Sequence, residues 1–293
     1  MNEAGVTNFR EGWLTSQDGL RLYYRDYDGG GISGTPVLCL PGVTRNSKDF
    51  ARLAERLSQR QSGRHRVICP DFRGRGRSQY DSDWTHYIPP TYVDDVRHLL
   101  VSLGIHRVHV IGTSLGGIVA MAMAVATPGV LASVVLNDIG PEIGSSALSA
   151  IMDYMKDDTP LPDWDTAAGH VRAAYLPNLP RGTQDDWMEI ARHTYRESAD
   201  GKLVHDWDYA IVKQFERAMT SRFELWPLFM ALGRVPVLCI RGALSSILSQ
   251  QTLALMKEAM PTMADVTAED CGHPARLSEP NVLEAIDAHL ARV

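Results

Sequence analysis

The sequence lacks the features of membrane proteins and of nucleic-acid-binding proteins. No stretch approaches the roughly 18 consecutive apolar residues that a membrane-spanning helix needs, and residues 1–17 are polar, without the apolar core of a signal peptide. The formal net charge is −6 and no block of lysine and arginine occurs, which argues against binding to phosphates or anionic lipid head groups. We therefore expect a soluble cytoplasmic protein that binds neither nucleic acid nor membrane, and whose partner is a small molecule, neutral and partly apolar. The sequence gives no indication of the oligomeric state.

Metal and nucleotide signatures are also scarce. The four cysteines have no C-x-x-C spacing, and three of them lie inside or at the end of apolar runs, as is typical of small buried side chains. They are Cys39, Cys69, Cys239 and Cys271. No group of cysteine, histidine and aspartate has zinc spacing, so we expect no metal ion. Gly29, Gly31 and Gly34 form G-x-G-x-x-G, but they precede an apolar run instead of opening a helix, which favours a loop over a nucleotide-binding site. We expect no cofactor.

Short apolar runs alternate with amphipathic segments through the first part of the chain and again near its end. The continuous apolar runs are typical of parallel strands that are buried on both faces. They are 36–40, 66–69, 108–111, 134–136, 237–240 and about 264–267. Helical spacing occurs at 47–60, 92–103 and 282–290, and residues 19–26 alternate like an early antiparallel strand. Because crossovers between parallel strands are right-handed, the pattern predicts an α/β fold with a doubly wound sheet.

This regularity breaks between about Gly140 and Leu232, where helical spacing recurs without an apolar strand run. We interpret residues 140–232 as a helical cap, or lid, inserted into a core formed by residues 1–139 and 233–293. Four of the six tryptophans fall in this insertion. About half of them are expected to be ordinary core residues, and the others to line a pocket between cap and sheet. The four are Trp164, Trp187, Trp207 and Trp226.

The most informative motif is Gly112-Thr113-Ser114-Leu115-Gly116, between a β-branched run and a helical run of small residues. A G-x-S-x-G pentapeptide at such a junction is typical of a nucleophile elbow, in which a tight turn exposes a strained serine. Ser114 is therefore the candidate nucleophile, and the chain is predicted to be an enzyme.

A serine hydroxyl needs an imidazole within hydrogen-bonding distance before it can attack a carbonyl group. In enzymes with a nucleophile elbow, that histidine comes late in the chain. His273 fits this order, because it lies 159 residues after Ser114, beyond the last strand-like run and before the last helix-like segment. For His170, in the insertion, contact with the substrate is one interpretation, and a solvated side chain is the simpler one.

A tetrahedral intermediate needs two backbone N–H groups that point at its oxyanion. Leu115, the residue after the nucleophile, is expected to supply one of them. The turn Pro41-Gly42-Val43 follows an apolar run, and the N–H of Val43 is the candidate for the other.

Taken together, these motifs resemble those of the α/β-hydrolase superfamily, in its serine hydrolase branch with a helical cap domain. Asp71-Phe72-Arg73-Gly74-Arg75-Gly76-Arg77-Ser78 resembles the D-x-R-G-x-G-x-S loop of that family, for which we expect a structural role, and Leu136–Pro141 and Gly272-His273 also match. The resemblance covers essentially the whole chain. It implies a mostly parallel sheet of the eight-stranded type and an esterase- or lactonase-like activity.

The chain departs from that family at the acid of the triad. Relatives place Asp or Glu after the strand that corresponds to 237–240, whereas this chain has Ser246 there. Three explanations remain open. Asp138, at the tip of the preceding sheet strand, acts as the acid; or Ser114 and His273 form a weakened dyad; or the chain is a variant in which the acid was replaced.

These observations predict a serine hydrolase that cleaves a carboxylic ester or lactone through an acyl-enzyme. One alternative is hydrolysis of C–C bonds in ring-cleavage products, although Pro41–Asn46 does not match the H-G-x-G-P-G loop of such relatives. The other is a weakly hydrolytic small-molecule receptor, which the missing acid would favour. The acyl and alcohol groups of the substrate cannot be inferred from the sequence, because cap side chains determine specificity.

Overall fold

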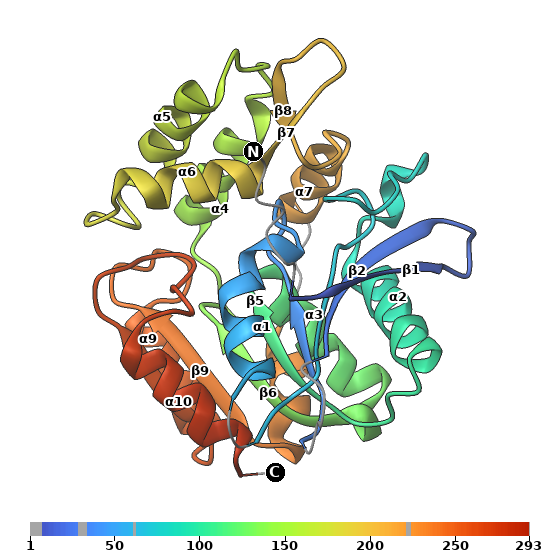
Figure 1. Ribbon diagram of the computed structural model, residues 1–293. Helices are drawn as coiled ribbons and strands as arrows, with labels where there is room; N and C mark the ends of the chain where they lie inside the picture. Colours follow the sequence, from blue (N-terminus) through green and yellow to red (C-terminus); the bar gives the residue numbers. More distant parts are fainter. Residues whose placement is uncertain (1–7, 29–33, 61–62, 221–223, 293) are drawn as a thin grey trace.

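A computed structural model describes residues 8–28, 34–60, 63–220 and 224–292 (Figure 1). Its centre is an eight-stranded sheet with the order β1-β2-β4-β3-β5-β6-β9-β10. The strands are β1 (Arg10–Thr15), β2 (Arg21–Tyr27), β3 (Val37–Leu40), β4 (Val67–Pro70), β5 (Val108–Thr113), β6 (Leu131–Asn137), β9 (Val237–Gly242) and β10 (Ala264–Ala268). The six strands from β4 to β10 are parallel, and β2 is antiparallel to both of its neighbours. The predicted α/β class with a mostly parallel sheet is confirmed.

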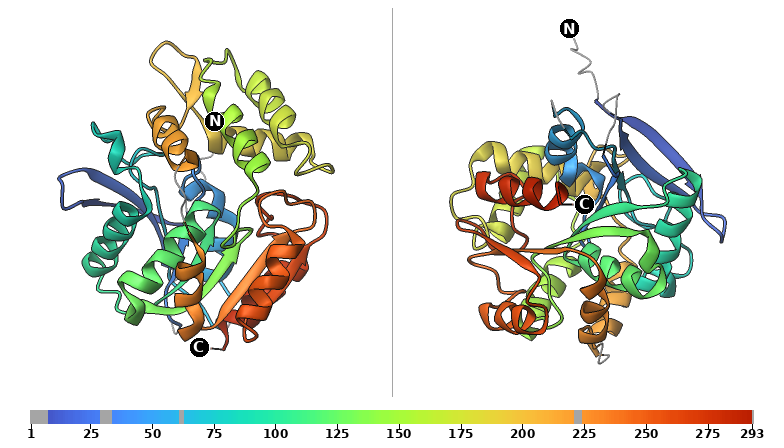
Figure 2. Two further views of the ribbon diagram at one scale, coloured as in Figure 1. Left: turned by 180° about the vertical axis from the view of Figure 1, so that it is seen from behind. Right: turned by 90° about the horizontal axis from the view of Figure 1, so that it is seen from below.

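Helices cover both faces of this sheet, as Figures 1 and 2 show. The buried apolar residues of α1 (Ala51–Ser58) and α10 (Pro280–Leu290) belong to the hydrophobic cluster on one face. Those of the helices on the other face belong to a second, larger cluster. These helices are α2 (Pro89–Ser102), α3 (Leu115–Ala126), α8 (Trp226–Ala231) and α9 (Gln250–Ala259). The doubly wound arrangement expected from the alternating pattern is confirmed.

Strand β1 was not expected from the sequence. Its residues alternate between exposed and half-buried because it lies at the edge of the sheet, paired only with β2. It therefore carries no apolar run of the kind that marks β3 to β6, whose residues are all buried.

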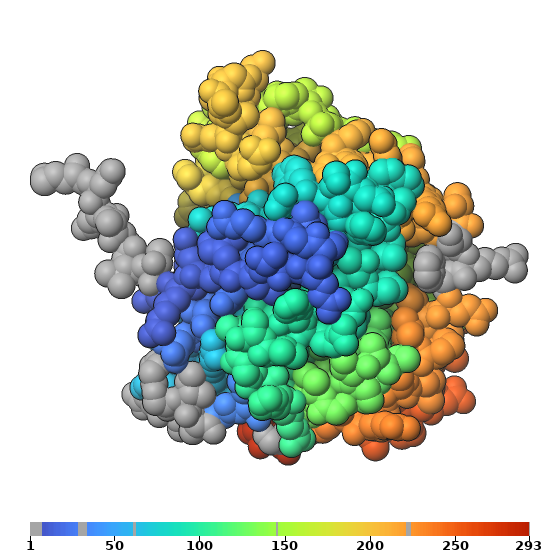
Figure 3. All heavy atoms as spheres, turned by 90° about the vertical axis from the view of Figure 1, so that its right-hand side faces the viewer, coloured from blue at the N-terminus to red at the C-terminus, as the bar shows by residue number. Residues whose placement is uncertain are grey.

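Residues 140–232, which we call the cap segment, lie between β6 and β9, and most of their helices rise above the core (Figures 1 and 3). They contain the helices α4 (Ser145–Lys156), α5 (Trp164–Tyr175), α6 (Gln184–Thr194) and α7 (Ile211–Thr220), together with α8, which packs against α3 of the core. The cap segment also contains a two-stranded sheet of β7 (Tyr195–Glu197) and β8 (Leu203–His205). The sequence indicated no strand there, because strands of three residues are too short to form an apolar run.

Two further observations bear on the expectations from the sequence. No helix among the described ranges is both long and apolar enough to span a membrane. Gly29 and Gly31 of the G-x-G-x-x-G pattern lie outside the residues that the structure describes.

Candidate active site

Ser114 occupies a strained turn between β5 and α3. Its backbone has φ +51° and ψ −114°, in the positive-φ region that residues with a side chain rarely adopt. The two motif glycines are needed for close packing around it. A Cβ atom on Gly116 would lie 2.1 Å from the carbonyl oxygen of Leu40, and one on Gly112 would lie 2.4 Å from that of Gly116. The sequence folds into this turn because side chains are excluded on both sides of the serine.

His273 lies in the loop that follows β10, and its imidazole points to Ser114. Nε2 of His273 is 3.1 Å from Oγ of Ser114, and Nδ1 is 2.8 Å from Oδ2 of Asp138. A carboxylate only accepts hydrogen bonds, so Nδ1 carries the proton and Nε2 is the acceptor that faces the serine hydroxyl. The structure thus joins residues 114, 273 and 138 in one hydrogen-bonded chain.

Asp138 follows β6 directly and is fully buried, with φ +57°. The backbone N–H of Gly242 donates to its Oδ1 over 2.9 Å, and the Ser245 hydroxyl donates to Oδ2 over 2.7 Å. Together with His273, these donors partner both carboxylate oxygens, which a buried charge requires. Of the open alternatives for the acid, Asp138 is the carboxylate that the structure places beside His273.

The loop after β9 carries donors where relatives carry the acid. Ser246 lines the cavity in front of Ser114, and no hydrogen bond joins it to His273 among the described residues. Its neighbour Ser245 donates to Asp138 and also accepts the N–H groups of Ile247 and Leu248. Sequence reasoning missed Ser245, because a serine in a loop carries no signal until its tertiary partner is known.

The two candidate oxyanion donors lie close to the nucleophile. A Cβ atom on Gly42 would be 3.9 Å from Cβ of Ser114, which places the turn containing Val43 beside the serine. Leu115 is the next residue in the chain and begins α3. Across the described residues, neither the Val43 N–H nor the Leu115 N–H donates to a protein acceptor. Of the two residues, Val43 lines the cavity in front of Ser114.

The loop of residues 71–78 supports this turn from behind. Asp71 accepts the N–H groups of Ser47 and Arg77, and Nε of Arg75 donates to the Val43 carbonyl oxygen over 2.9 Å. Arg75 is almost fully buried. These contacts are structural: they hold the backbone on which the candidate oxyanion donor lies.

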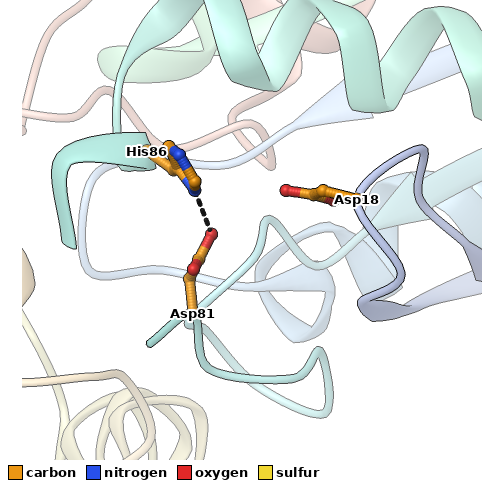
Figure 4. Close-up of side chains that lie close together, drawn as sticks. All are labelled: Asp18, Asp81 and His86. Carbon is orange, nitrogen blue, oxygen red and sulfur yellow. Dashed lines mark hydrogen bonds and ion pairs between the residues drawn. The ribbon is translucent and has the colours of Figure 1, made fainter. Parts of the chain in front are cut away.

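A cluster of Asp18, Asp81 and His86 lies elsewhere, beside the same loop, as Figure 4 shows. Its ligand atoms are close enough together to hold a metal ion. However, one guanidinium nitrogen of Arg73 lies 2.6 Å from Asp18 and 2.8 Å from Asp81. The hydrogen bond from Arg73 lowers the pKa of Asp18 to about 2. The carboxylates of the cluster thus already have a cationic partner in Arg73.

A cavity of about 610 Å³ opens in front of Ser114, between the core and the cap segment. On the cap side, acidic and histidine side chains such as Asp153, Glu189 and His193 line it alongside small or apolar residues from α4, α5 and α6. These residues include Ala147, Ile151, Tyr154, Ala174, Tyr175 and Ile190. The expectation that cap tryptophans line the pocket is wrong, since none of Trp164, Trp187, Trp207 and Trp226 does so. Trp187 and Trp207 are instead buried in hydrophobic clusters, where an indole ring covers more apolar surface than at a cavity wall.

His170 also lines this cavity, in contrast to the expected solvated side chain. Nδ1 of His170 lies 2.6 Å from the hydroxyl oxygen of Tyr195, and Nε2 lies 3.3 Å from Oδ2 of Asp157. Sequence spacing gave no sign of this contact, because Tyr195 belongs to the short strand β7, which the sequence did not indicate.

The cationic side chains that line the cavity are already paired with carboxylates. Arg45 contacts Asp49 at 2.6 Å. Burial raises the pKa of Asp49, but the charge and hydrogen bond of Arg45, together with His193, lower it further, so this pKa lies well below its ordinary value. The remaining pairs are Arg52–Glu189, Arg276–Asp186 and Lys48–Asp206. Asp153, in contrast, has no ion-pair partner among the residues described. Among the described lining residues, the cavity thus offers an anionic substrate no arginine or lysine without a carboxylate partner.

Comparison with known proteins agrees with this geometry. A family model described as "Alpha/beta hydrolase family" matches residues 37–286. A 3-hydroxybutyrate-oligomer hydrolase of Cupriavidus necator is 29% identical over 268 residues, covering 89% of each chain. A 2-(acetamidomethylene)succinate hydrolase of Mesorhizobium japonicum is 29% identical over 255 residues, covering 87% of each. The crystal structure of an alpha/beta hydrolase from Novosphingobium aromaticivorans superposes with a TM-score of 0.91 at 40% identity, covering 99% of this chain and 100% of that one.

Proposed function

The chain belongs to the alpha/beta hydrolase family, and from this premise we propose that it hydrolyses a carboxylic ester or lactone through an acyl-enzyme on Ser114. The observation that carries the proposal is the hydrogen-bonded chain from Ser114 through His273 to the buried Asp138. This arrangement supplies a nucleophile, a base and a group that orients the base.

In the first half of the proposed reaction, Oγ of Ser114 attacks the ester carbonyl carbon while Nε2 of His273 takes the hydroxyl proton. The negative charge moves to the carbonyl oxygen, where the N–H groups of Val43 and Leu115 stabilise it. Asp138 keeps the proton of the neutral imidazole on Nδ1 and stabilises the imidazolium once it forms. The tetrahedral intermediate collapses, His273 protonates the leaving alkoxide oxygen, and the acyl group remains on Ser114.

In the second half, His273 removes a proton from a water molecule, which attacks the acyl carbon. Collapse of the second intermediate returns the proton to Ser114 and releases the carboxylic acid. A lactone follows the same steps, except that the alcohol stays attached to its own acyl chain throughout, so that deacylation releases a single hydroxy acid.

The cavity supports a neutral, partly apolar substrate. Its arginine and lysine side chains are paired with carboxylates, whereas Asp153 has no ion-pair partner among the described residues. Part of its cap-side lining is apolar. A volume of about 610 Å³ lies in the range of small-molecule sites. We further propose that the cap segment is a lid domain that determines which acyl and alcohol groups fit.

Two alternatives have less support. A C–C bond hydrolase of ring-cleavage products would use the same three residues, but Pro41–Asn46 departs from the oxyanion loop expected of such relatives. A weakly hydrolytic receptor was favoured by the absence of an acid at position 246. The contact between Asp138 and His273 supports the hydrolase over the receptor.

The test is turnover of p-nitrophenyl acetate by the wild-type chain and by Ser114→Ala. We expect multiple turnovers above about 1 per second for the wild type and a loss of at least about 10³-fold in the variant. Mass spectrometry of the quenched wild-type reaction should find one acetyl group on Ser114. Ser102→Ala, an exposed serine of α2, is the matched control and should keep full activity. Equal activity of wild type and Ser114→Ala would overturn the proposal. Thermal stabilisation by the ester without turnover would point to the receptor.

A further inference from the structure

The loop that carries His273 is held by the cap segment through Asn178. The backbone N–H of Gly272 donates to the carbonyl oxygen of Asn178 over 2.7 Å. The backbone N–H of His273 donates to the side-chain Oδ1 of Asn178 over 3.1 Å. One residue of the cap segment thus accepts two consecutive N–H groups, one of which belongs to the candidate catalytic histidine.

Gly272 and Asn178 are in close contact. A Cβ atom on Gly272 would lie 2.3 Å from Oδ1 of Asn178, so the loop can approach this closely only with glycine at that position. Asn178 is itself fixed just after α5, because its N–H donates to the Tyr175 carbonyl oxygen over 2.9 Å. Figures 1 and 2 show the turn between α5 and α6 next to the red loop that follows β10.

Two ion pairs join the same segments, through residues that lie on either side of Gly272 and His273 in the chain. Arg181 of the cap segment lies 2.7 Å from Asp270, and Asp186 lies 2.7 Å from Arg276. The first pair is largely exposed and contributes little energy. The second is better shielded, and hydrogen bonds with Thr183 and Arg276 outweigh burial to hold the pKa of Asp186 at about 2.

The core also holds this loop, but at different atoms. Nδ2 of Asn137 donates to the Ala275 carbonyl oxygen over 3.0 Å. The backbone N–H of Leu244 donates to the Cys271 carbonyl oxygen, also over 3.0 Å. Among the described residues, the backbone N–H of His273 donates only to Oδ1 of Asn178, in the cap segment. A displacement of the cap segment from the sheet must therefore break the contacts of Asn178 or shift the backbone of His273.

We propose that Asn178 is a positioning residue that makes the orientation of His273, and with it the activation of Ser114, depend on the cap segment being closed over the cavity. The inference rests on the proposed function, because it assigns His273 the role of base. The side-chain oxygen of Asn178 acts through the His273 backbone and takes no part in bond making.

The test compares Asn178→Ala with Asn178→Asp. The alanine variant loses Oδ1, whereas the aspartate variant retains an oxygen acceptor. It replaces the amide nitrogen, for which no hydrogen bond is found among the described residues, by a second oxygen and adds a negative charge. We expect kcat for p-nitrophenyl acetate to fall about tenfold in Asn178→Ala, which corresponds to the loss of one hydrogen bond, with KM changed less than about twofold. Asn178→Asp should recover at least half of the wild-type kcat on the pH plateau.

A second readout separates positioning from contact with the substrate, since Asn178 also lines the cavity. Phosphonylation of Ser114 by an alkyl fluorophosphonate also requires His273 as base, so its rate constant should fall by the same factor as kcat. That factor should be the same for acetyl and butyryl esters. A loss that grows with acyl length, or that appears only in KM, would assign Asn178 to substrate binding and overturn the proposal.

Leu176→Ala is the matched control, because Leu176 lies in the same turn and is 42% exposed. It should keep wild-type kcat. An unchanged kcat in Asn178→Ala, or an aspartate variant as slow as the alanine variant, would refute the role of Asn178. Neither result would affect the proposed function, which depends on Ser114→Ala.

Discussion

Nδ1 of His273 lies 2.8 Å from Oδ2 of Asp138, a residue 135 positions earlier in the chain. The carboxylate therefore comes from the tip of β6, not from the loop after β9, where the family resemblance implies it. That loop instead contributes the Gly242 N–H and the Ser245 hydroxyl, which both donate to Asp138. A carboxylate beside His273 is thus present despite Ser246.

The first prediction concerns Asp138→Asn. The amide keeps the shape of the carboxylate, but its NH2 group can favour the imidazole tautomer that presents an N–H to Ser114. We expect kcat for p-nitrophenyl acetate to fall by about 10⁴, with the fold retained in circular dichroism. A loss below about tenfold would indicate that Ser114 and His273 work without this acid.

Ser246→Asp tests the same point in the opposite direction. Because Asp138 already partners His273, a carboxylate at position 246 is expected to leave kcat unchanged or to lower it. A clear increase in kcat would show that the wild-type chain lacks an effective acid, and would favour the dyad or variant explanations.

The second prediction concerns the elbow glycine in Gly116→Ala. The added methyl group would lie 2.1 Å from the Leu40 carbonyl oxygen, which requires β3 and α3 to move apart. We expect the free energy of unfolding in urea to fall by about 3 kcal/mol or more. Gly129→Ala is the matched control, since nothing lies within 4 Å of a Cβ atom there. Equal stability of the two variants would contradict the packing argument.

The third prediction concerns substrate charge. Because the cationic side chains lining the cavity are paired, a substrate carboxylate would lose its hydration there without gaining an unpaired cation. We expect kcat/KM for p-nitrophenyl butyrate to exceed that for the mono-p-nitrophenyl ester of succinic acid by about tenfold or more. Comparable kcat/KM values for the two esters, at both low and high salt, would show that the cavity binds anions.

The fourth prediction concerns acid stability and His289→Leu. His289 is buried in α10, and burial lowers the pKa of its imidazole to about 4 from the ordinary 6.5. The folded protein thus binds this proton more weakly than the unfolded chain does. The stability that neutral His289 provides is complete above pH 6.5 and is lost as the pH falls towards 4.

Urea unfolding at pH 7 and pH 5 measures this effect. In His289→Leu, the decrease in the free energy of unfolding between the two pH values should be smaller than in the wild type. The difference in slope is at most about 1.4 kcal/mol per pH unit for one proton. Burial also lowers the pKa of His109 to about 4, so part of the decrease should persist in the variant. Identical pH dependence in both proteins would contradict the assignment to His289.

The sequence revealed those features whose causes are local in the chain. Ser114 was identifiable because the strained turn needs small residues at fixed spacing, and the buried strands because parallel strands covered on both faces require continuous apolar runs. His273 followed from chain order. The edge strand β1 and the three-residue strands of the cap segment were missed, because partial exposure and short length leave no periodic signal.

Only the tertiary structure decided which carboxylate meets His273 and which residues surround the cavity. The pairing of Asn137 with Ile240 between β6 and β9 sets Asp138 beside Gly242 and Ser245, and no local pattern encodes that register. Local patterns also do not encode the contact of Asn178 with the His273 loop, or the absence of the four cap tryptophans from the cavity lining. Such contacts depend on how distant segments pack, whereas a tight turn depends only on its own few residues.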